Sequence, residues 1–330
     1  MHSQAIAFGL TLTADFPLPG LRSGVPLPGR DGYGRPLRLV RVPWSELAAL
    51  ARPRDHVGYR RMFDGCQFAM CRRPAGDVLF DYGPRALFHL SADHRVLRCA
   101  AVDGDDPTWQ RVLLDTVLWA TSFLRGLELL HASAVETTAG VLALLAPSGG
   151  GKSSLAAELL RRGGRLFSDD IVAFEQVGGK VLAHPGPPLM NLSSTLAVGD
   201  PGRFETIAEI AGERWVRVRQ ERARPLALAA IVLVERGDVT GVGRLGARAL
   251  NADCALTAAT TLTLLRHGVG LAHCRKRAHR RFALFSALAA ATPVYRLTAD
   301  TTVPVAELAD LMERRVGLGS GSCSPQPACA

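Results

Sequence analysis

The sequence predicts an α/β protein in which a mixed sheet flanked by helices follows a smaller, mainly β N-terminal domain. Residues 1–104 hold short apolar stretches broken by proline and glycine, which is typical of strands and turns. After residue 130, strand-like runs alternate with apolar residues at helical spacing. Hydrophobic residues make up 48% of the 330 residues and aromatic ones only 6%, a composition that suits helices packed on sheets.

The N-terminal domain, residues 1–104, is expected to be a half-exposed antiparallel sheet. Apolar and polar residues alternate in several of its stretches, as they do in strands with one buried face. The strand candidates are 16–21, 25–30, 36–42, 77–83, 86–90 and 95–102. No catalytic constellation is found among them.

A helix over 107–126 is expected to connect the first domain to the second, which spans 105–316. Asp106 is suited to cap this helix and Pro107 to begin it. Downstream, strands are predicted at 133–136, 141–145, 171–177, 180–184, 228–235 and 294–297, and helices from 152 to about 162 and at 250–266, 276–291 and 303–315. Residues 317–330 have the composition of a disordered tail.

The stretch "APSGGGKSS" at 146–154 is the most specific signal in the chain. It stands between an apolar strand and a helix and matches the phosphate-binding loop G-x-x-x-x-G-K-[ST], with Ala146 at the first position. Such a loop turns backbone N–H groups toward an anion, which side chains obstruct, and the next helix adds its positive dipole end. The residues expected to bind the nucleotide are Ser148, Gly149, Gly150, Gly151, Lys152, Ser153 and Ser154.

Two adjacent acids, Asp169 and Asp170, follow the loop at the end of a predicted strand. Kinase chemistry needs one carboxylate near Mg²⁺ and one to accept the proton of the attacking hydroxyl. Neighbouring residues of a strand point to opposite faces, so both acids can face the phosphate only if the chain bends there. A solvated strand end or a helix cap is the alternative explanation. Upstream, His131 directly precedes the strand expected beside the loop strand, and by itself it fits a structural histidine as well.

Together, "LHASAV", "APSGGGKSSLAAELLRRG" and "LFSDDIV" resemble the HPr kinase/phosphorylase family, most of all its HPr-kinase-related branch from gene clusters for ribosomally made peptides such as lasso peptides. In that branch a kinase phosphorylates a serine of the precursor peptide. The resemblance is strong over 130–185 and weaker through "AHPGPPLMNLSS", "TPVYRL" and "FGLTLTADFPLPGL". It implies a mixed α/β fold with a phosphate loop, related to phosphoenolpyruvate carboxykinase.

The resemblance also implies roles for individual residues. Lys152 and Ser153 would handle the phosphates and Mg²⁺, Asp169 would be the general base, and Asp170 would lie near the metal. His131 would sit close to the transferred phosphate. The signature L-E-I-R-G-L-G of the bifunctional enzymes is missing, and residues 184–195 stand in its place. HPr as the substrate, and a reverse phosphorylase activity, are therefore not expected.

The net charge of +9 and the isoelectric point near 9.6 favour an acidic partner. Two arginine-rich stretches, 214–224 and 275–281, are either solvated basic surfaces or sites for an acidic peptide or the transferring phosphate. Nucleic acid is disfavoured, because no recognition motif and no interleaved aromatic residues accompany the charge. Oligomerisation stays open.

The location expected for the protein is the cytoplasm. The seven cysteines form no CxxC pair and no zinc spacing, which favours reduced thiols. No signal peptide and no membrane-spanning segment are expected from the pattern of apolar residues.

The sequence therefore predicts an ATP- and Mg²⁺-dependent kinase that acts on a serine or threonine hydroxyl of a peptide or protein. Two alternatives are a small-molecule kinase of the same fold, for example one for free serine, and a nucleotide-binding regulatory module without catalysis.

Overall fold

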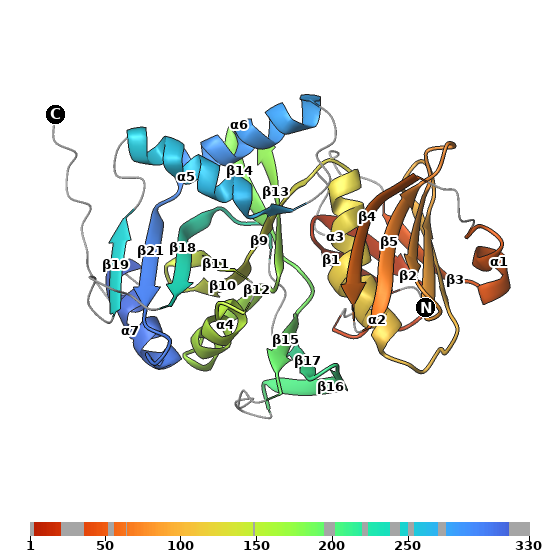
Figure 1. Ribbon diagram of the computed structural model, residues 1–330, viewed down its shortest axis with the longest axis horizontal. Coiled ribbons are helices and arrows are strands. Elements are labelled where there is room, and N and C mark those ends of the chain that lie inside the picture. The colour runs from red at the N-terminus through yellow and green to blue at the C-terminus, as the bar shows by residue number, and fades with distance from the viewer. Residues whose placement is uncertain are drawn as a thin grey trace.

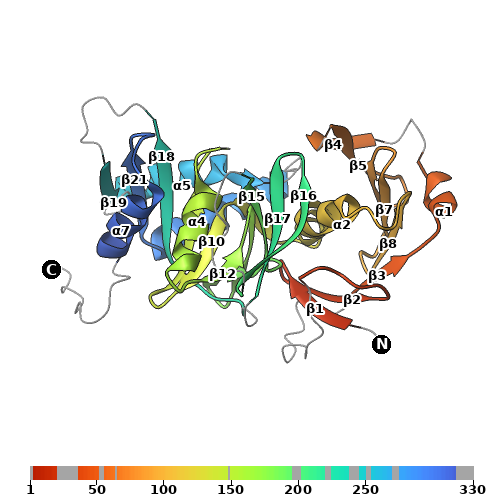
Figure 2. The same cartoon turned by 90° about the horizontal axis from the view of Figure 1, so that it is seen from below.

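The computed structural model describes residues 3–20, 36–51, 56–63, 65–147, 149–194, 202–219, 224–237, 245–249, 254–269 and 275–316. The predicted strand 25–30 and the predicted tail 317–330 lie outside these residues. The chain is a mixed α/β protein with four sheets (Figures 1 and 2).

The first part of the chain forms an eight-stranded sheet in the order β1-β2-β3-β8-β7-β6-β5-β4. Its strands are β1 (Ser3–Ala7), β2 (Leu10–Ala14), β3 (Leu37–Arg41), β4 (His56–Phe63), β5 (Cys66–Arg72), β6 (Val78–Tyr82), β7 (Ala86–Leu90) and β8 (Val96–Ala101). The short helix α1 (Trp44–Ala48) follows β3. The expected antiparallel pairing is wrong at β3, which runs parallel to both β2 and β8. The expected strand at 16–21 is also wrong for residues 16–20, which form turns around prolines.

The predicted helix 107–126 is confirmed as a nearly continuous run with an irregular centre. It consists of α2 (Thr108–Val112), a π-helical turn η1 (Leu113–Val117) and α3 (Leu118–Leu124). Its apolar side chains share one core with the eight-stranded sheet, and this core extends to Leu129, Ile171 and Ala173 in the second half of the chain. The predicted domain limits stay a prediction.

The second half is built around a six-stranded sheet in the order β12-β10-β11-β18-β21-β19. Its strands are β10 (Ser133–Thr137), β11 (Gly140–Leu145), β12 (Arg165–Ser168), β18 (Leu228–Arg236), β19 (Leu245–Ala249) and β21 (Val294–Ala299). The central strands β11, β18 and β21 are parallel, and the outer pairs are antiparallel. Every strand predicted here is found, including the strand that ends just before Asp169 (β12), and β19 is additional.

Helices cover both faces of this sheet, as Figure 1 shows. They are α4 (Lys152–Arg161) and α7 (Val305–Val316) on one face, and α5 (Cys254–Arg266) and α6 (Arg275–Ala291) on the other. The side chains of β11 alternate accordingly: Leu142 and Leu144 join the core with α4 and α7, whereas Ala143 and Leu145 join the core with α5 and α6. The parallel strands thus lie in the middle of three layers, as parallel sheets do.

Two smaller sheets complete the fold. The four-stranded sheet β14-β13-β9-β20 contains β9 (Glu128–His131), β13 (Ile171–Val177), β14 (Lys180–His184) and β20 (Gly268–Val269). The three-stranded sheet β15-β17-β16 contains β15 (Leu189–Ser193), β16 (Phe204–Ile210) and β17 (Glu213–Val218). The predicted hairpin of β13 and β14 is confirmed, with Gly178 and Gly179 at positive φ in its turn. The three-stranded sheet is not predicted from the sequence.

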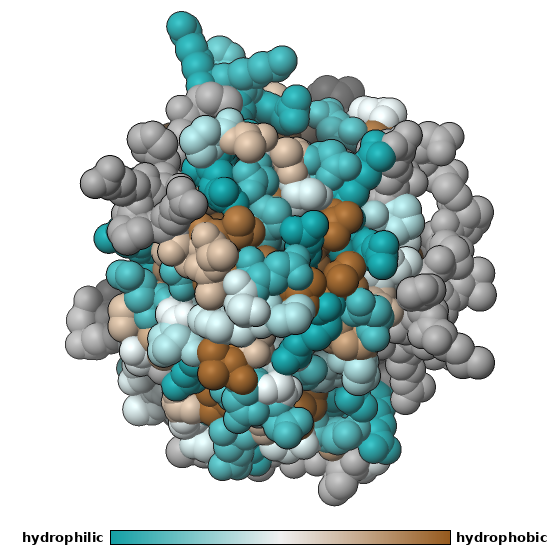
Figure 3. All heavy atoms as spheres, turned by 90° about the vertical axis from the view of Figure 1, so that its right-hand side faces the viewer, coloured by the Kyte–Doolittle hydropathy of each residue, from teal (hydrophilic) through white to brown (hydrophobic). Residues whose placement is uncertain are grey.

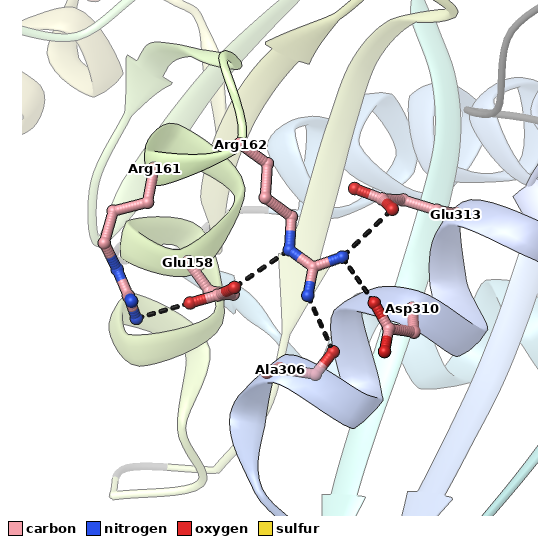
Figure 4. Close-up of polar contacts among 6 residues, drawn as sticks. All are labelled: Glu158, Arg161, Arg162, Ala306, Asp310 and Glu313. Carbon is pink, nitrogen blue, oxygen red and sulfur yellow. Dashed lines mark hydrogen bonds and ion pairs between the residues drawn. The ribbon is translucent and has the colours of Figure 1, made fainter.

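A polar brace joins α4 to α7 (Figure 4). The guanidinium of Arg162, just after α4, donates to Glu158 at 2.8 Å, to Asp310 at 2.6 Å and to Glu313 at 3.0 Å. It also donates to the carbonyl oxygen of Ala306 at 3.0 Å. These contacts hold the C-terminal end of α4 against α7, while the N-terminal end of α4 meets the glycine loop.

Figure 3 looks onto the end of the molecule that the eight-stranded sheet forms. Hydrophobic side chains on this face are spread in small groups among hydrophilic ones. In the described part of the chain, no helix has the length and hydropathy that a membrane crossing requires. Cys66 and Cys99 are in no disulfide. The cytoplasmic location stays a prediction.

Candidate active site

The glycine loop follows β11, and its three glycines are needed for two different reasons. Gly149 and Gly151 have φ values of 74° and 89°, in the left-handed region that glycine adopts without strain. Gly150 lacks space: a Cβ there would lie 2.8 Å from the Cβ of Ala146 and 2.9 Å from the carbonyl oxygen of Pro147. The loop therefore closes more tightly than residues with side chains allow. Ser148, a predicted nucleotide-binding residue, lies outside the described residues.

Helix α4 begins at Lys152, directly after the loop. The side chain of Lys152 is buried, yet it makes no hydrogen bond or ion pair with the residues that the structure describes. No side chain caps the N-terminus of α4 either, although Ser153 and Ser154 lie in its first turn. A buried cation that contacts no acid is costly, even where a carboxylate acts on it from a longer distance. The loop and the helix end thus concentrate positive charge that an anion can satisfy.

The chain bends sharply at the two adjacent acids. Asp170 has φ 63°, a left-handed conformation, and the N–H of Ile171 donates to the carbonyl oxygen of Asp169 at 2.8 Å. Because of this bend, the strict alternation of a strand does not apply, and both carboxylates reach residues of the same site. The condition stated from the sequence, that the chain must bend here, is met.

Asp169 is the more enclosed of the two acids. Its Oδ1 accepts hydrogen bonds from the hydroxyl of Ser133 at 2.6 Å and from that of Ser153 at 3.2 Å. Its Oδ2 accepts one from the backbone N–H of Asn191 at 3.2 Å. Burial raises the pKa of Asp169, and the neighbouring charge of Asp170 raises it further. The contact with Ser153 joins the acid pair to the first turn of α4.

Asp170 is the more accessible acid, with 51% of its side chain exposed, and it lies 3.5 Å from Nε2 of His131. Partial burial by itself would raise the pKa of Asp170. The hydrogen bond and charge of His131, with the charges of Lys152 and Arg61, lower it below its usual value instead. Two predicted residues, His131 and Lys152, thus act on the same carboxylate.

The site lies where the chain crosses twice between the four-stranded and the six-stranded sheet. The chain leaves β9 of the four-stranded sheet at His131 and enters β10 of the six-stranded sheet at Ser133. It passes back from β12 to β13 through Asp169 and Asp170. The N–H of Ala132 donates to the carbonyl oxygen of Asp170 at 3.0 Å, which fixes the two crossings side by side.

A third acid, Asp115 in the π-helical turn η1, approaches this site and is not predicted from the sequence. Its Oδ2 accepts a hydrogen bond from Nδ2 of Asn191 at 2.9 Å, and Nε of Arg111 lies 3.7 Å away. Asn191 therefore bridges Asp115 to Asp169. Burial raises the pKa of Asp115 to about 7, and the charges of both site aspartates contribute. The feature of the sequence that could have indicated Asp115 is a single acid within the apolar stretch 112–124. π-Helical turns occur often at functional sites.

Three other residues near the site were also missed. Ser133 stands two positions after His131, so strand alternation could have placed the two on one face. Arg61, from β4 of the eight-stranded sheet, lies close enough to act on Asp170 electrostatically. Arg236, at the end of β18, would be 3.5 Å from a Cβ on Gly151 and donates to the carbonyl oxygen of Thr301 at 2.9 Å.

Part of the basic cluster 275–281 is internal. The guanidinium groups of Arg277 and Arg281 both pair with the buried Glu128 of β9, at 3.0 and 2.9 Å. Each also donates to backbone carbonyl groups, those of Phe123 and Leu127 for Arg277 and that of Val269 for Arg281. The two arginines therefore hold α6 on β9, and an external anion is not their partner.

In the other basic stretch, 214–224, two arginines share one acid. Arg217 and Arg219 both approach Oε2 of Glu205 at 3.3 Å. These two arginines, two positions apart, therefore lie on the same side, and their charges are partly compensated by Glu205 of the three-stranded sheet. Arg222 lies outside the described residues.

No group of three or more histidine, cysteine, aspartate or glutamate side chains in the described residues is arranged to hold a metal ion by itself. Mg²⁺ sites in nucleotide-dependent enzymes need less than this, because the phosphates and water supply most of the ligands.

Comparisons with known proteins give distant likenesses among solved structures. No family model matches the sequence, and the search of curated proteins found no match. Among solved structures, the HPr(Ser) kinase/phosphatase from Coxiella burnetii is similar over 57% of this chain and 93% of that chain, with 12% identity and a TM-score of 0.30. A likeness this distant says nothing about chemistry, and the function proposed below rests on the residues of this chain.

Proposed function

We propose that this protein is an ATP- and Mg²⁺-dependent phosphotransferase that phosphorylates a serine or threonine hydroxyl on a peptide or protein. The observation that carries the proposal is the convergence of a glycine loop, a buried lysine, a histidine and two carboxylates from separate segments. The acid pair is joined to α4 through the contact of Ser153 with Asp169 at 3.2 Å and to β9 through the approach of His131 to Asp170 at 3.5 Å.

The loop and the start of α4 have the properties of a site for nucleotide phosphates. Lys152 is buried and forms no ion pair or hydrogen bond with an acid in the described residues, and no side chain caps the helix N-terminus. Phosphate oxygens would satisfy both, since backbone N–H groups and a lysine are the usual partners of nucleotide phosphates in loops of this kind.

The residues also fit Mg²⁺. The hydroxyl of Ser153 and the carboxylate of Asp169 are already in contact, and a hydroxyl with one or two carboxylates is the usual protein share of such a site. Mg²⁺ bound there would neutralise charge that develops on the phosphates during transfer. Asn191 and Ser133 hold the Asp169 carboxylate in place through the hydrogen bonds described above.

The second carboxylate, Asp170, is the better placed general base. Three donors of the protein already occupy the oxygens of Asp169, whereas Asp170 is half exposed and, among the described residues, has His131 at salt-bridge distance. In the transfer step, the acceptor oxygen bonds to the γ-phosphorus as the bond from that phosphorus to ADP breaks. The proton of the hydroxyl passes to Asp170. This assignment reverses the roles expected from the family resemblance, in which Asp169 is the base and Asp170 lies near the metal.

Phosphoryl transfer is tested with the full chain, ATP labelled at the γ-position, Mg²⁺ and a library of serine- and threonine-containing peptides, with free serine in a separate reaction. We expect label on peptides. We expect Asp170→Asn to lower turnover by about 10²- to 10⁴-fold, the usual contribution of a general base, while nucleotide binding persists. Asp105→Asn changes an exposed acid and is the matched control.

Three results would contradict the proposal. Label on free serine but not on any peptide would favour a small-molecule kinase. Nucleotide binding without transfer to any acceptor would favour a regulatory module. Full activity of Asp170→Asn, with loss of activity in Asp169→Asn that added Mg²⁺ does not restore, would return the base to Asp169.

A further inference from the structure

A groove lies between α5 and α6, outside the site described above. It has a volume of about 770 Å³ and is lined by residues of both helices: Leu265, Ala278, His279, Arg281, Phe282 and Ala283. The two helices lie side by side over one face of the six-stranded sheet (Figure 1). The sides of the two helices that face the sheet already pack in the core, because Leu264, Phe285 and Leu288 are buried there.

Large apolar side chains are exposed beside this groove. The exposed fraction of Leu262 on α5 is 59% and that of Phe282 on α6 is 52%. Leu262 stands three residues before the groove residue Leu265, so both lie on one side of α5. Burying a leucine or phenylalanine side chain removes its apolar surface from water and is favourable, and much of this gain is unused at Leu262 and Phe282. Single exposed apolar residues are common, but two beside an apolar groove indicate a binding surface.

The same two helices carry basic side chains but no acidic ones. The stretch 254–299 contains seven arginine and lysine residues and no aspartate or glutamate, although the chain has 30 acids in 330 residues. Arg277 and Arg281 are neutralised by Glu128. The remaining cations of the two helices are exposed and have no acidic partner in the described residues: Arg266, Arg275, Lys276 and Arg280.

The cations at the start of α6 gain nothing from the helix itself. Positive charge at a helix N-terminus opposes the helix dipole, and α6 has no acid in its first turn to offset it. Arg275, His279 and Phe282 follow at spacings of four and three, so they form a line along one side of α6. A ligand along this line would meet the positive charge of Arg275 first and the aromatic ring of Phe282 about two turns further.

The groove is also connected to the candidate active site. Strand β20 begins two residues after α5 ends and pairs with β9. The backbone N–H of His131, at the end of β9, donates to the carbonyl oxygen of His267 at 2.8 Å. A chain bound near the C-terminal end of α5 is therefore close to the histidine beside Asp170.

We infer that the groove between α5 and α6 binds an acidic peptide segment that carries a large apolar side chain, with its carboxylates on the exposed cations and the apolar side chain beside Phe282. This rests on the proposed function in one respect, because the segment is assigned to the protein or peptide that accepts the phosphate. The groove then supplies docking contacts, while the glycine loop and the acid pair carry out the transfer.

Binding is measured by fluorescence anisotropy on the full chain, without nucleotide, so that it does not depend on catalysis. The probe is a labelled peptide in which leucines alternate with pairs of glutamates. Two control peptides have lysine in place of glutamate, or glycine in place of leucine. We expect the acidic, leucine-containing peptide to bind at least about tenfold more tightly than either control, a difference of about 1.4 kcal/mol.

Two variants test the two components of the surface. Leu262→Ser with Phe282→Ser removes the apolar side chains, and Arg275→Ser, Lys276→Ser and Arg280→Ser together remove the charge. Each set is expected to weaken the acidic peptide at least about tenfold. Arg314→Ser with Arg315→Ser removes exposed charge from α7, on the other face of the sheet, and is expected to leave binding unchanged. Unchanged nucleotide binding in all variants shows that they are folded.

Other occupants of the groove would give distinct results. Tighter binding of a single-stranded DNA oligonucleotide than of the peptide would overturn the inference in favour of nucleic acid. Concentration-dependent dimerisation that Phe282→Ser abolishes, without peptide binding, would overturn it in favour of a second copy. Equal weakening by the α7 control would show that net charge alone attracts the peptide, which also overturns it. Peptide binding that persists while no phosphate is transferred contradicts the proposed function and leaves the groove assignment standing.

Discussion

The glycine loop and the π-helical turn η1 both bring a charged side chain into the candidate active site, but they do so by different means. In the loop, residues 146–153 are consecutive and their spacing alone fixes where Lys152 and Ser153 lie relative to the strand and the helix. In η1, Asp115 reaches the site because an asparagine 76 residues away donates to it and because the helix packs on a distant sheet.

The position of the loop residues is set by their local sequence, whereas the position of Asp115 is set by contacts with residues far away in the sequence. A loop whose geometry is set by its own glycines can be recognised in the sequence and can be disrupted by one added methyl group. A residue placed by tertiary packing leaves only an indirect trace, and substituting it acts through the neighbours it contacts. Three substitutions would sharpen or break this comparison.

The largest effect is expected for Gly150→Ala in the loop. The new Cβ would meet the Cβ of Ala146 at 2.8 Å and a backbone oxygen of Pro147 at 2.9 Å, so the loop backbone must move. We expect nucleotide affinity, measured by titration of ATP in the presence of Mg²⁺, to fall at least about tenfold. Gly163→Ala is the control: its φ of 99° is strained for alanine, but the space around it is open. It is expected to lower stability by about 1 kcal/mol without affecting nucleotide binding. Wild-type affinity in Gly150→Ala would contradict the local account of the loop.

The next effect concerns Asp115 and is a pH dependence of stability. Its pKa is raised from 3.8 to about 7, so the folded state holds the proton more tightly than the unfolded state. The unfolding free energy of the native protein therefore falls, through this group, as pH rises from about 4 to about 7. Asp115→Asn has no group that titrates here, so it does not lose unfolding free energy in this way. The unfolding free energy of the variant minus that of the native protein should therefore increase over this window by up to a few kcal/mol, since one pKa unit corresponds to about 1.4 kcal/mol.

Urea unfolding of both proteins at several pH values between 4 and 8 measures this difference, with Asp105→Asn as an exposed control. A difference between Asp115→Asn and the native protein that does not vary with pH would show that the carboxyl group is not buried beside Asn191 and the acid pair as described.

The smallest effect is expected for Arg162→Ala in the brace between α4 and α7 (Figure 4). Its four hydrogen bonds are partly exposed, so their loss should lower the unfolding free energy by about 1–2 kcal/mol and leave nucleotide affinity unchanged. Arg161→Ala removes a neighbouring arginine that, within the described part of the chain, pairs with Glu158 alone, and it should cost less. A drop in nucleotide affinity in Arg162→Ala would mean that the far end of α4 controls the loop.

The sequence predicts the strands and helices around the glycine loop well because each has a strong local pattern. The strands around the glycine loop are short apolar runs, α4 ends at the left-handed Gly163, and the β13–β14 hairpin turns on two glycines. The N-terminal sheet is predicted less well. Proline-rich stretches such as 16–20 imitate strands, and the parallel pairing of β3 depends on chain segments that only the fold brings together.

For the candidate site, the sequence indicates the residues of the loop and the acid pair, and the fold brings them together. It does not indicate the bend at Asp170, which depends on the chain leaving one sheet for another. Nor does the sequence distinguish arginines that are paired inside the protein from those on its surface. Arg277 and Arg281 look like surface charges at the start of a helix, but a buried acid on β9 pairs with both. Ser133 and Asn191 lie within stretches that carry the family resemblance, but the resemblance assigns them no role, and Asp115 lies in an apolar stretch without any motif.

The most direct test of the central claim, that Lys152 and the loop form a site for nucleotide phosphates, is a calorimetric titration of ATP with Mg²⁺ into three forms of the full chain. They are the native protein, Lys152→Met and the exposed-lysine control Lys180→Met. A charge-assisted contact contributes about 1.5–3 kcal/mol, so Lys152→Met should bind ATP about tenfold to a hundredfold more weakly, with Lys180→Met unchanged. Equal affinity in all three forms would contradict the account.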